Sequence, residues 1–341
     1  MPFFKRIPLK ILIPSAVCVL ALLVSLFSFL SVSADKGTLP AQDAAARWRG
    51  ESDERFTQVS VFLPESAAFT PEKVYDFRAA LEARFLSESI EAEEGASLYK
   101  DAFAALCGAM TAKGDYGSSP VEVYALGGDW FFFHPLPLAS GGYIRDDELM
   151  HDRVVLDTVA AWQLFGATDV AGRTVVIGDA DYIVAGVVER EADRYSEKAD
   201  DGSARLYAYA DAPTGLIQDK PVACYEIVLP DPVSGFGRKL MEDVFPKTGG
   251  ELVENSTRYD IPALWEVLKS FSSRTIRKND VTYPYWENAA RLSENHAARL
   301  LPFWLVPPLL PLAFLVTLGV VFANKGVKKV AEKIKRYREF G

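Results

Sequence analysis

The chain has 341 residues, of which 49% are hydrophobic and 24% charged, and its formal net charge is −9. These values exclude a disordered or collagen-like chain and leave room for a folded core beside membrane spans. The acidity also argues against nucleic acid as a partner, because phosphates would be repelled.

Two long runs, 11–33 and 300–324, contain no charged side chain. Crossing the bilayer core takes about 20 apolar residues, so each run predicts a transmembrane helix. The flanking segments 1–10 and 325–341 hold 10 of the 37 basic and 2 of the 46 acidic residues, which leaves 27 basic and 44 acidic residues, a net charge of −17, between them. Basic flanks stay cytoplasmic, so we expect a two-pass protein of the plasma membrane, with both termini inside and 34–299 outside.

The first apolar run has an alternative interpretation as a cleaved signal peptide. Val32 and Ala34 stand where a signal peptidase prefers small residues. The run is longer than the apolar part of a usual signal peptide, and this favours a retained anchor. If cleavage occurs, the second run alone anchors the chain.

The outer segment begins with a linker or helical stalk over 35–50 and a strand over Gln58–Leu63, where apolar residues alternate. Thr70, Pro71 and Glu72 then form the start signal of a helix. The apolar residues of this helix recur at helical spacing: Val74, Phe77, Leu81 and Phe85.

The next passages are less regular. Residues 105–117 suggest a turn-rich passage, and Val121–Leu126 predicts a second strand. The aromatic group Trp130–Phe133 suggests a buried strand, with alternate rings on opposite faces.

The centre of the chain is the most patterned part. Val154–Leu156 predicts a short strand, and Asp157 can cap a helix that ends at Gly166 in a left-handed conformation. A hairpin over 173–188 follows. The remaining expected elements are strands at 206–210 and 225–229 and helices at 236–245 and 261–272. The predicted fold class is α+β, with mixed sheets.

The central residues also follow a recognisable order. It consists of Phe131–Phe133, Pro137–Gly142, Val154–Leu156, Ala160–Gly166, Val170–Ile177, Tyr182–Val188 and, further on, Tyr283–Arg291. This order resembles the MacB-like periplasmic core domain of ABC transporter permeases of the FtsX/MacB type. The resemblance rests on residues with structural roles in turns, helix ends and close contacts: Leu164, Phe165, Gly166, Gly172, Gly178, Gly186, Trp286 and Asn288.

The resemblance implies a domain between two membrane helices that takes part in export or transmits ATP-driven motion. The chain departs from the family pattern, because it has two predicted spans where permeases have more. It also has no G-x-x-x-x-G-K-[ST] motif for nucleotide binding. The implied partners are a separate ABC ATPase subunit, further permease chains and the lipid bilayer.

Candidate chemistry is sparse. The three histidines, His134, His151 and His296, have no metal-ligand spacing, and the acidic clusters 91–94, 146–148 and 200–201 have no calcium-loop spacing. Ser140-Gly141-Gly142 lacks the pattern around a catalytic serine and suggests a loop. We therefore expect no enzyme, with no catalytic, cofactor-binding or metal-binding residues.

Two further features leave alternatives open. Cys107 and Cys224 can form a disulfide or remain two buried thiols. The aromatic group Tyr283–Trp286 precedes the second run, where rings favour the membrane interface, and ligand binding is the less favoured interpretation.

The basic tail predicts a short amphipathic helix, since Val327, Val330 and Ile334 recur on one face. It can rest in the headgroup layer, or dock on an ATPase as the coupling helix that the resemblance implies. The leading function is a non-catalytic, permease-like subunit for substrate handling or mechanotransmission. The alternative is a membrane-anchored sensor or scaffold that regulates envelope proteins without transport.

Overall fold

The computed structural model describes residues 9–91, 97–212, 220–274, 277–278 and 280–339. The chain forms two compact units. The globular unit consists of Gly37–Asp260 and Ser270–Ser293, and the helical unit of Met1–Lys36, Ile261–Lys269 and Glu294–Gly341.

The strands belong to the globular unit. They are β1 (Phe56–Phe62), β2 (Lys100–Lys113), β3 (Ser118–Gly128), β4 (Leu138–Gly141), β5 (Arg153–Asp157), β6 (Thr174–Ile177), β7 (Ala180–Val188), β8 (Arg205–Tyr209), β9 (Val222–Pro230), β10 (Glu251–Glu254), β11 (Arg277–Lys278) and β12 (Val281–Thr282). The α-helices of this unit are α2 (Ala44–Arg49), α3 (Pro71–Ser87), α4 (Trp130–Phe133), α5 (Thr158–Phe165), α6 (Ser196–Ala199) and α7 (Phe236–Val244). Within the described residues this is a mixed α+β fold, as the sequence predicts.

The main sheet closes on itself. Its order is β10-β1-β9-β2-β3-β8-β5-β7-β4, and β6 pairs with both β2 and β7. The strands β2, β3, β8, β5, β7 and β6 therefore form a ring, and β10, β1 and β9 extend the sheet from β2. The pairs β3–β8 and β5–β7 are parallel, and the other pairs are antiparallel.

The strand β2 serves both parts of the sheet. Its register with β3 shifts between Leu106 and Gly108, and Gly108 has a φ of +76°, which glycine adopts without steric cost. Before this bulge β2 pairs with β9, and at its end it pairs with β6. The predicted turn-rich passage at 105–117 was therefore wrong, because the glycine marks a bulge within a long strand.

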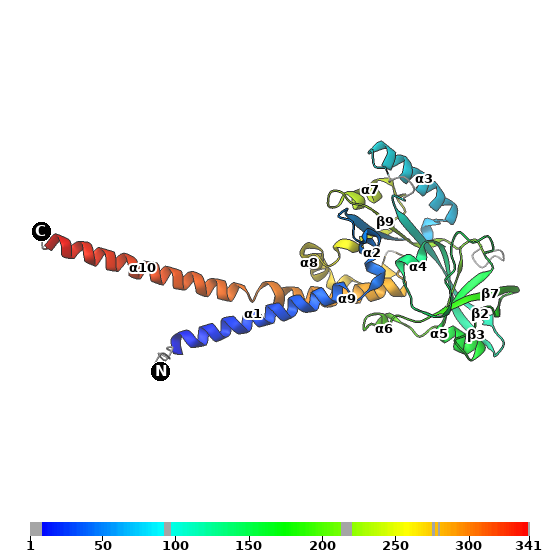
Figure 1. Ribbon diagram of the computed structural model, residues 1–341, viewed down its shortest axis with the longest axis horizontal. Coiled ribbons are helices and arrows are strands. Elements are labelled where there is room, and N and C mark those ends of the chain that lie inside the picture. Colours follow the sequence, from blue (N-terminus) through cyan, green and yellow to red (C-terminus); the bar gives the residue numbers. More distant parts are fainter. Residues whose placement is uncertain (1–8, 92–96, 213–219, 275–276, 279, 340–341) are drawn as a thin grey trace. The chain divides into compact units, whose positions relative to one another are not determined.

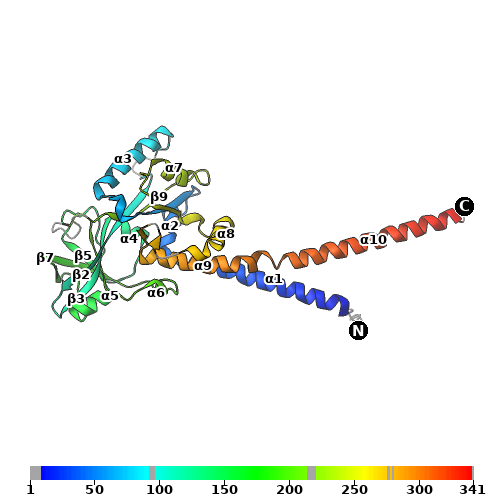
Figure 2. The ribbon, with the colours of Figure 1, turned by 180° about the vertical axis from the view of Figure 1, so that it is seen from behind.

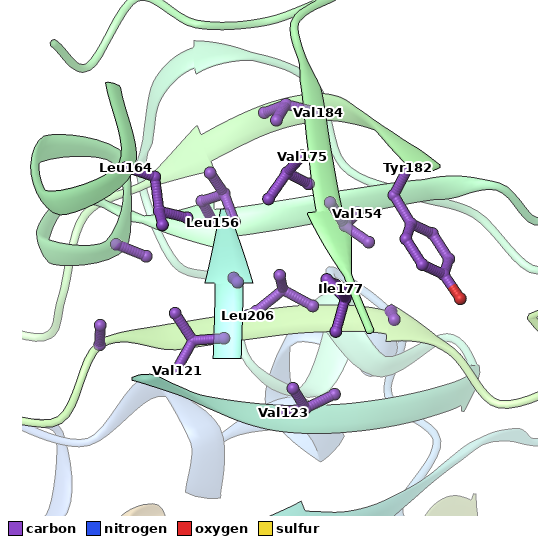
Figure 3. Packing of buried hydrophobic residues seen from close by; sticks show 14 of the residues in the cluster. Val121, Val123, Val154, Leu156, Leu164, Val175, Ile177, Tyr182, Val184 and Leu206 are labelled. Carbon is purple, nitrogen blue, oxygen red and sulfur yellow. The ribbon is translucent and has the colours of Figure 1, made fainter. Parts of the chain in front are cut away.

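The ring encloses an apolar core (Figure 3). Val121, Leu156, Val175 and Leu206 are buried in it, and Leu164 from α5 packs against the same cluster. The hairpin β6–β7 and the helix α5 thus share one core. Asp157 caps α5 by accepting a 2.7 Å hydrogen bond from the backbone N–H of Ala160.

Two helices, α3 and α7, pack on the part of the sheet that contains β1 and β9 (Figure 1). All four apolar residues predicted for α3 are buried. The aromatic residues of α4 lie in a further core cluster with Phe62, Cys224 and Tyr283. The prediction of a strand at 130–133 was wrong: Trp130 and Phe133 are buried three residues apart, which is helical spacing.

The helical unit contains α1 (Leu9–Lys36), α8 (Ile261–Lys269), the end of α9 (Tyr285–Leu305) and α10 (Leu309–Glu339). The α1 helix lies beside the end of α9 (Figure 2), and Phe29 contacts Trp304 with ring centroids 5.3 Å apart. The buried residues of α1 alternate by four and three positions, which is the spacing of a helix–helix seam: Ala21, Ser25, Ser28, Val32 and Asp35.

Two stretches of the described helices are long and apolar enough to cross a membrane, Leu12–Lys36 and Tyr285–Glu332. The second is not one continuous helix. The segment 300–324 is interrupted, since α9 ends at Leu305 and α10 begins at Leu309. Pro307 and Pro308 lie in the gap, and neither has a backbone N–H to continue the helical hydrogen bonds.

Candidate functional site

The start of α9 is buried in the globular unit. Tyr283, Tyr285 and Trp286 are each less than 10% exposed and belong to its core. Asn288 fixes the helix start, because its side-chain amide donates a 2.9 Å hydrogen bond to the carbonyl of Tyr283. The expectation that these rings lie at a membrane interface was wrong, because they pack in a core cluster of the globular unit. The sequence pattern could not reveal this, since the other residues of the cluster come from distant parts of the chain.

Behind these rings lies a buried carboxylate with two guanidinium partners. Glu287 is 2% exposed. The Arg258 Nη2 atom donates to both of its oxygens, at 2.6 and 2.8 Å, and the Arg291 Nε atom donates to one of them at 2.8 Å. Two cations held on one buried anion hold the helix at one position, because a shift of the helix would break these charge-assisted hydrogen bonds.

The network continues to the edge strand β10. An Arg291 nitrogen lies 3.0 Å from a Glu251 oxygen, and the Tyr283 hydroxyl donates to the same carboxylate. Burial alone would raise the pKa of Glu251, but the Arg291 charge and the hydrogen bonds from Tyr283 and Arg291 hold this pKa below its ordinary value. Glu251 is therefore ionised at neutral pH and completes the charge pairing.

On the other side, the network reaches β1 and β9. Asn255 links Arg258 to Ser60 through hydrogen bonds of 3.1 and 2.7 Å. Ser60 donates a 2.8 Å hydrogen bond to Glu226, whose other oxygen lies 2.5 Å from the His134 Nε2 atom. One chain of polar contacts thus joins α9 to three strands and to the residue that follows α4.

A second group of contacts holds Tyr285. The Arg205 guanidinium lies 3.6 Å from the centroid of its ring, and its hydroxyl is 3.3 Å from that of Tyr207. The same hydroxyl donates a 3.4 Å hydrogen bond to Glu191. Burial raises the pKa of the Glu191 carboxyl, while a backbone hydrogen bond and the charge of Arg205 only partly oppose this rise. The first turn of α9 is therefore held from two sides.

The arrangement suits mechanical attachment. Its charged groups are paired with one another. In the described part of the chain, three or more His, Cys, Asp or Glu side chains never gather closely enough for a metal ion. His151 pairs with Asp211 at 2.5 Å and His296 with Asp35 at 2.7 Å. Of the acidic cluster at 91–94, positions 92–94 lie outside the described residues.

The globular unit also carries an open cleft of about 680 Å³. Aromatic residues of α4 and the loop after β4 line it, among them Phe131, Phe132 and Tyr143. Each basic side chain on its wall pairs with an acid: Arg78 with Asp101, Lys100 with Asp129, and Arg145 with Asp147. The predicted acidic cluster at 146–148 therefore borders a cleft with aromatic walls.

The residues of the sequence motif lie in two places. The first group lies on α5, on β7 and in the turns before and within the hairpin β6–β7: Leu164, Phe165, Gly166, Gly172, Gly178 and Gly186. Gly186 approaches the neighbouring chain so closely that a Cβ atom would lie 2.4 Å from the carbonyl oxygen of Gly142. Trp286 and Asn288 lie at the start of α9. Phe165 is only partly buried, whereas Leu164 is fully buried.

Sequence reasoning missed the role of Arg258, Glu287 and Arg291. A usable signal was present, since Glu287 and Arg291 are four residues apart on a helix that leads into an apolar run. The partner Arg258 comes from a loop 29 residues earlier, and no pattern in the sequence connects it to α9. In the tail, Val327, Val330 and Ile334 are exposed on α10.

No family model matches the chain, and no curated protein matches it. Among solved structures, the chain is similar to the periplasmic region of MacB from Actinobacillus actinomycetemcomitans, with 16% identity and a TM-score of 0.43, over 64% of this chain and 94% of that one. It is also similar to the extracellular domain of the noncanonic ABC-type transporter YknZ from Gram-positive bacteria, with 15% identity and a TM-score of 0.40, over 57% of this chain and 99% of that one.

Proposed function

We propose that the chain is a non-catalytic, ABC-permease-like membrane subunit whose outer domain transmits motion or handles a substrate, together with a separate ATPase. The single observation that carries this proposal is the attachment of α9 through Glu287 to Arg258 and Arg291. The order of motif residues across the centre of the chain, which resembles the MacB-like core of such permeases, supports it.

The attachment makes α9 suitable for carrying a displacement. Residues 285–293 of α9 belong to the globular unit, and the later residues, which lead into the apolar run, belong to the helical unit. Buried ion pairs resist separation, because an unpaired buried charge costs about 3–5 kcal/mol. A shift of the helix would therefore be passed to β1, β9 and β10 before these contacts break.

The proposed topology has both termini in the cytoplasm and the globular unit outside. In this arrangement the tail of α10 lies on the side where ATP is available. Its exposed apolar residues Val327, Val330 and Ile334 would dock on the ATPase subunit or rest in the headgroup layer. Further permease chains would complete the transport path.

The test is purification of the tagged full-length protein from its native membrane, with identification of the proteins that accompany it. We expect an ABC ATPase subunit among them. Ile334→Asp should remove it, because a charge would enter the apolar docking face, whereas Glu332→Asp on the same turn should not. If no ATPase accompanies the unmodified protein, the proposal of a permease-like subunit is wrong.

A membrane-anchored sensor or scaffold is the second candidate. The cleft of about 680 Å³ with its aromatic wall favours this function, because a partner or ligand could bind there without transport. Co-purification of envelope proteins without an ATPase, lost in Phe131→Ala or Tyr143→Ala, would support it.

A further inference from the structure

The short helix α8 differs from its neighbours in the chain. Asp260 before it and Ser270 after it belong to the globular unit, but Ile261–Lys269 belongs to the helical unit with α1 and α10. The nine residues of α8 are thus grouped with the two apolar stretches, although the residues on both sides of α8 belong to the globular unit.

The α8 helix is apolar on two faces. Leu264 and Val267 form the buried face, at 0% and 7% exposure. On the other face Ile261 and Trp265, one turn apart, are 42% and 46% exposed. The two charges of the helix, Glu266 and Lys269, pair with each other at 2.7 Å. A helix that is apolar on both faces is suited to burial on both.

We propose that the Ile261–Trp265 face of α8 lies in the headgroup region of the outer leaflet of the same bilayer that α1 crosses. This inference rests on the proposed two-pass topology. The outward side chains of α1, such as Phe27 and Leu30, are exposed and apolar, as a lipid-facing surface requires, and α8 belongs to the same compact unit. Tryptophan prefers this layer, because its ring is apolar and its N–H can reach polar groups.

A second exposed tryptophan, Trp162, shows why we assign lipid contact to Trp265 in particular. Trp162 on α5 is also exposed, at 59%, but its helix belongs to the globular unit. Exposure of a tryptophan alone therefore does not imply lipid contact. Trp265 differs from Trp162 because it belongs to the unit that contains the apolar stretches, and exposed Ile261 lies one turn away from it.

The test uses nitroxide labels on the full chain in vesicles of equal parts phosphatidylcholine and phosphatidylglycerol. Cys18→Ser removes the thiol in α1, and single labels are placed through Trp265→Cys, Trp162→Cys and Phe27→Cys. Oxygen partitions into lipid, while a polar nickel chelate without net charge stays in water. We expect the ratio of oxygen to nickel accessibility to be highest at position 27, intermediate at position 265 and lowest at position 162.

The outcomes separate the inference from the topology. If position 27 is in lipid and position 265 behaves like position 162, the inference about α8 is overturned and the topology stands. If position 27 itself is in water, the topology fails first. A second measurement avoids the label at 265: quenching of tryptophan fluorescence by brominated lipid should decrease in Trp265→Phe and stay unchanged in Trp162→Phe.

Discussion

The Ser25 hydroxyl donates a 2.7 Å hydrogen bond to the backbone carbonyl of Trp304. In a continuous helix this carbonyl would accept a hydrogen bond from the N–H of residue 308, but Pro308 has none. Ser25 on α1 thus supplies the donor that the proline removes. The interruption between α9 and α10 is therefore compensated by the neighbouring helix.

Ser25→Ala should weaken the contact between α1 and α9 because it leaves that carbonyl without a donor in an apolar setting. The expected loss is about 0.5–2 kcal/mol, the range for hydrogen bonds between membrane helices. Thermal unfolding of the full chain in detergent measures it. Ser33→Ala, at an exposed position of the same helix, is the control and should have no effect. Equal stability of the two variants would contradict the proposed role of Ser25.

Leu164→Ala should destabilise the globular unit by about 2–5 kcal/mol, the usual cost of a cavity at a fully buried leucine. Phe165→Ala should cost clearly less, since Phe165 is only partly buried and its removal leaves a dent at the surface. Denaturant unfolding of both variants provides the comparison. A larger loss for Phe165→Ala than for Leu164→Ala would show that the core has been assigned to the wrong side of α5.

Glu287→Gln should loosen the start of α9. The substitution removes the negative charge that the Arg258 and Arg291 guanidinium groups share, and breaking a buried ion pair typically costs about 3–5 kcal/mol. Protection of the α9 amides from hydrogen exchange should fall in this variant. Glu266→Gln, an exposed site, is the matched control. Unchanged protection would mean that the aromatic contacts alone hold the helix.

Glu191→Gln should raise the melting temperature at neutral pH. Because burial raises the folded-state pKa of Glu191 above its unfolded value, ionisation of this carboxyl opposes folding once the pH exceeds the unfolded pKa. The difference between the variant and the unmodified protein should therefore shrink as the pH falls through that range. Glu189→Gln, at an exposed position two residues away, is the control for the substitution itself. A lower melting temperature for Glu191→Gln at neutral pH would contradict the assignment.

The cysteines should react slowly with iodoacetamide in the native protein. Cys107 and Cys224 are buried free thiols, and burial raises the pKa of Cys107 to about 11 and that of Cys224 above its ordinary value. Little thiolate is then present at neutral pH. After unfolding without reductant, all 3 cysteines of the chain should become alkylated. Alkylation of only Cys18 would instead demonstrate a disulfide between the other two.

The local elements were largely predictable, because their signals lie within a few residues. The helix start at Thr70-Pro71, the Asp157 cap and the hairpin over 173–188 all have short-range causes: a fixed φ, a side-chain acceptor and turn glycines. The failures at 105–117 and 130–133 have a different origin. A bulge at Gly108 and a one-turn helix resemble a turn and a strand until their pairing partners are known.

The sequence by itself determined the two charge-free runs, the basic flanks and the α+β class, because each follows from composition or short-range periodicity. Only the tertiary structure decided that β6 closes the ring, that Tyr283–Trp286 are buried and that Glu287 meets Arg258. These contacts join residues from separate elements, and the local sequence around each residue does not predict its partner. Burial makes these contacts necessary, because a charged group away from water is costly unless it is paired. The ion pairs at the start of α9 therefore hold the helix in place.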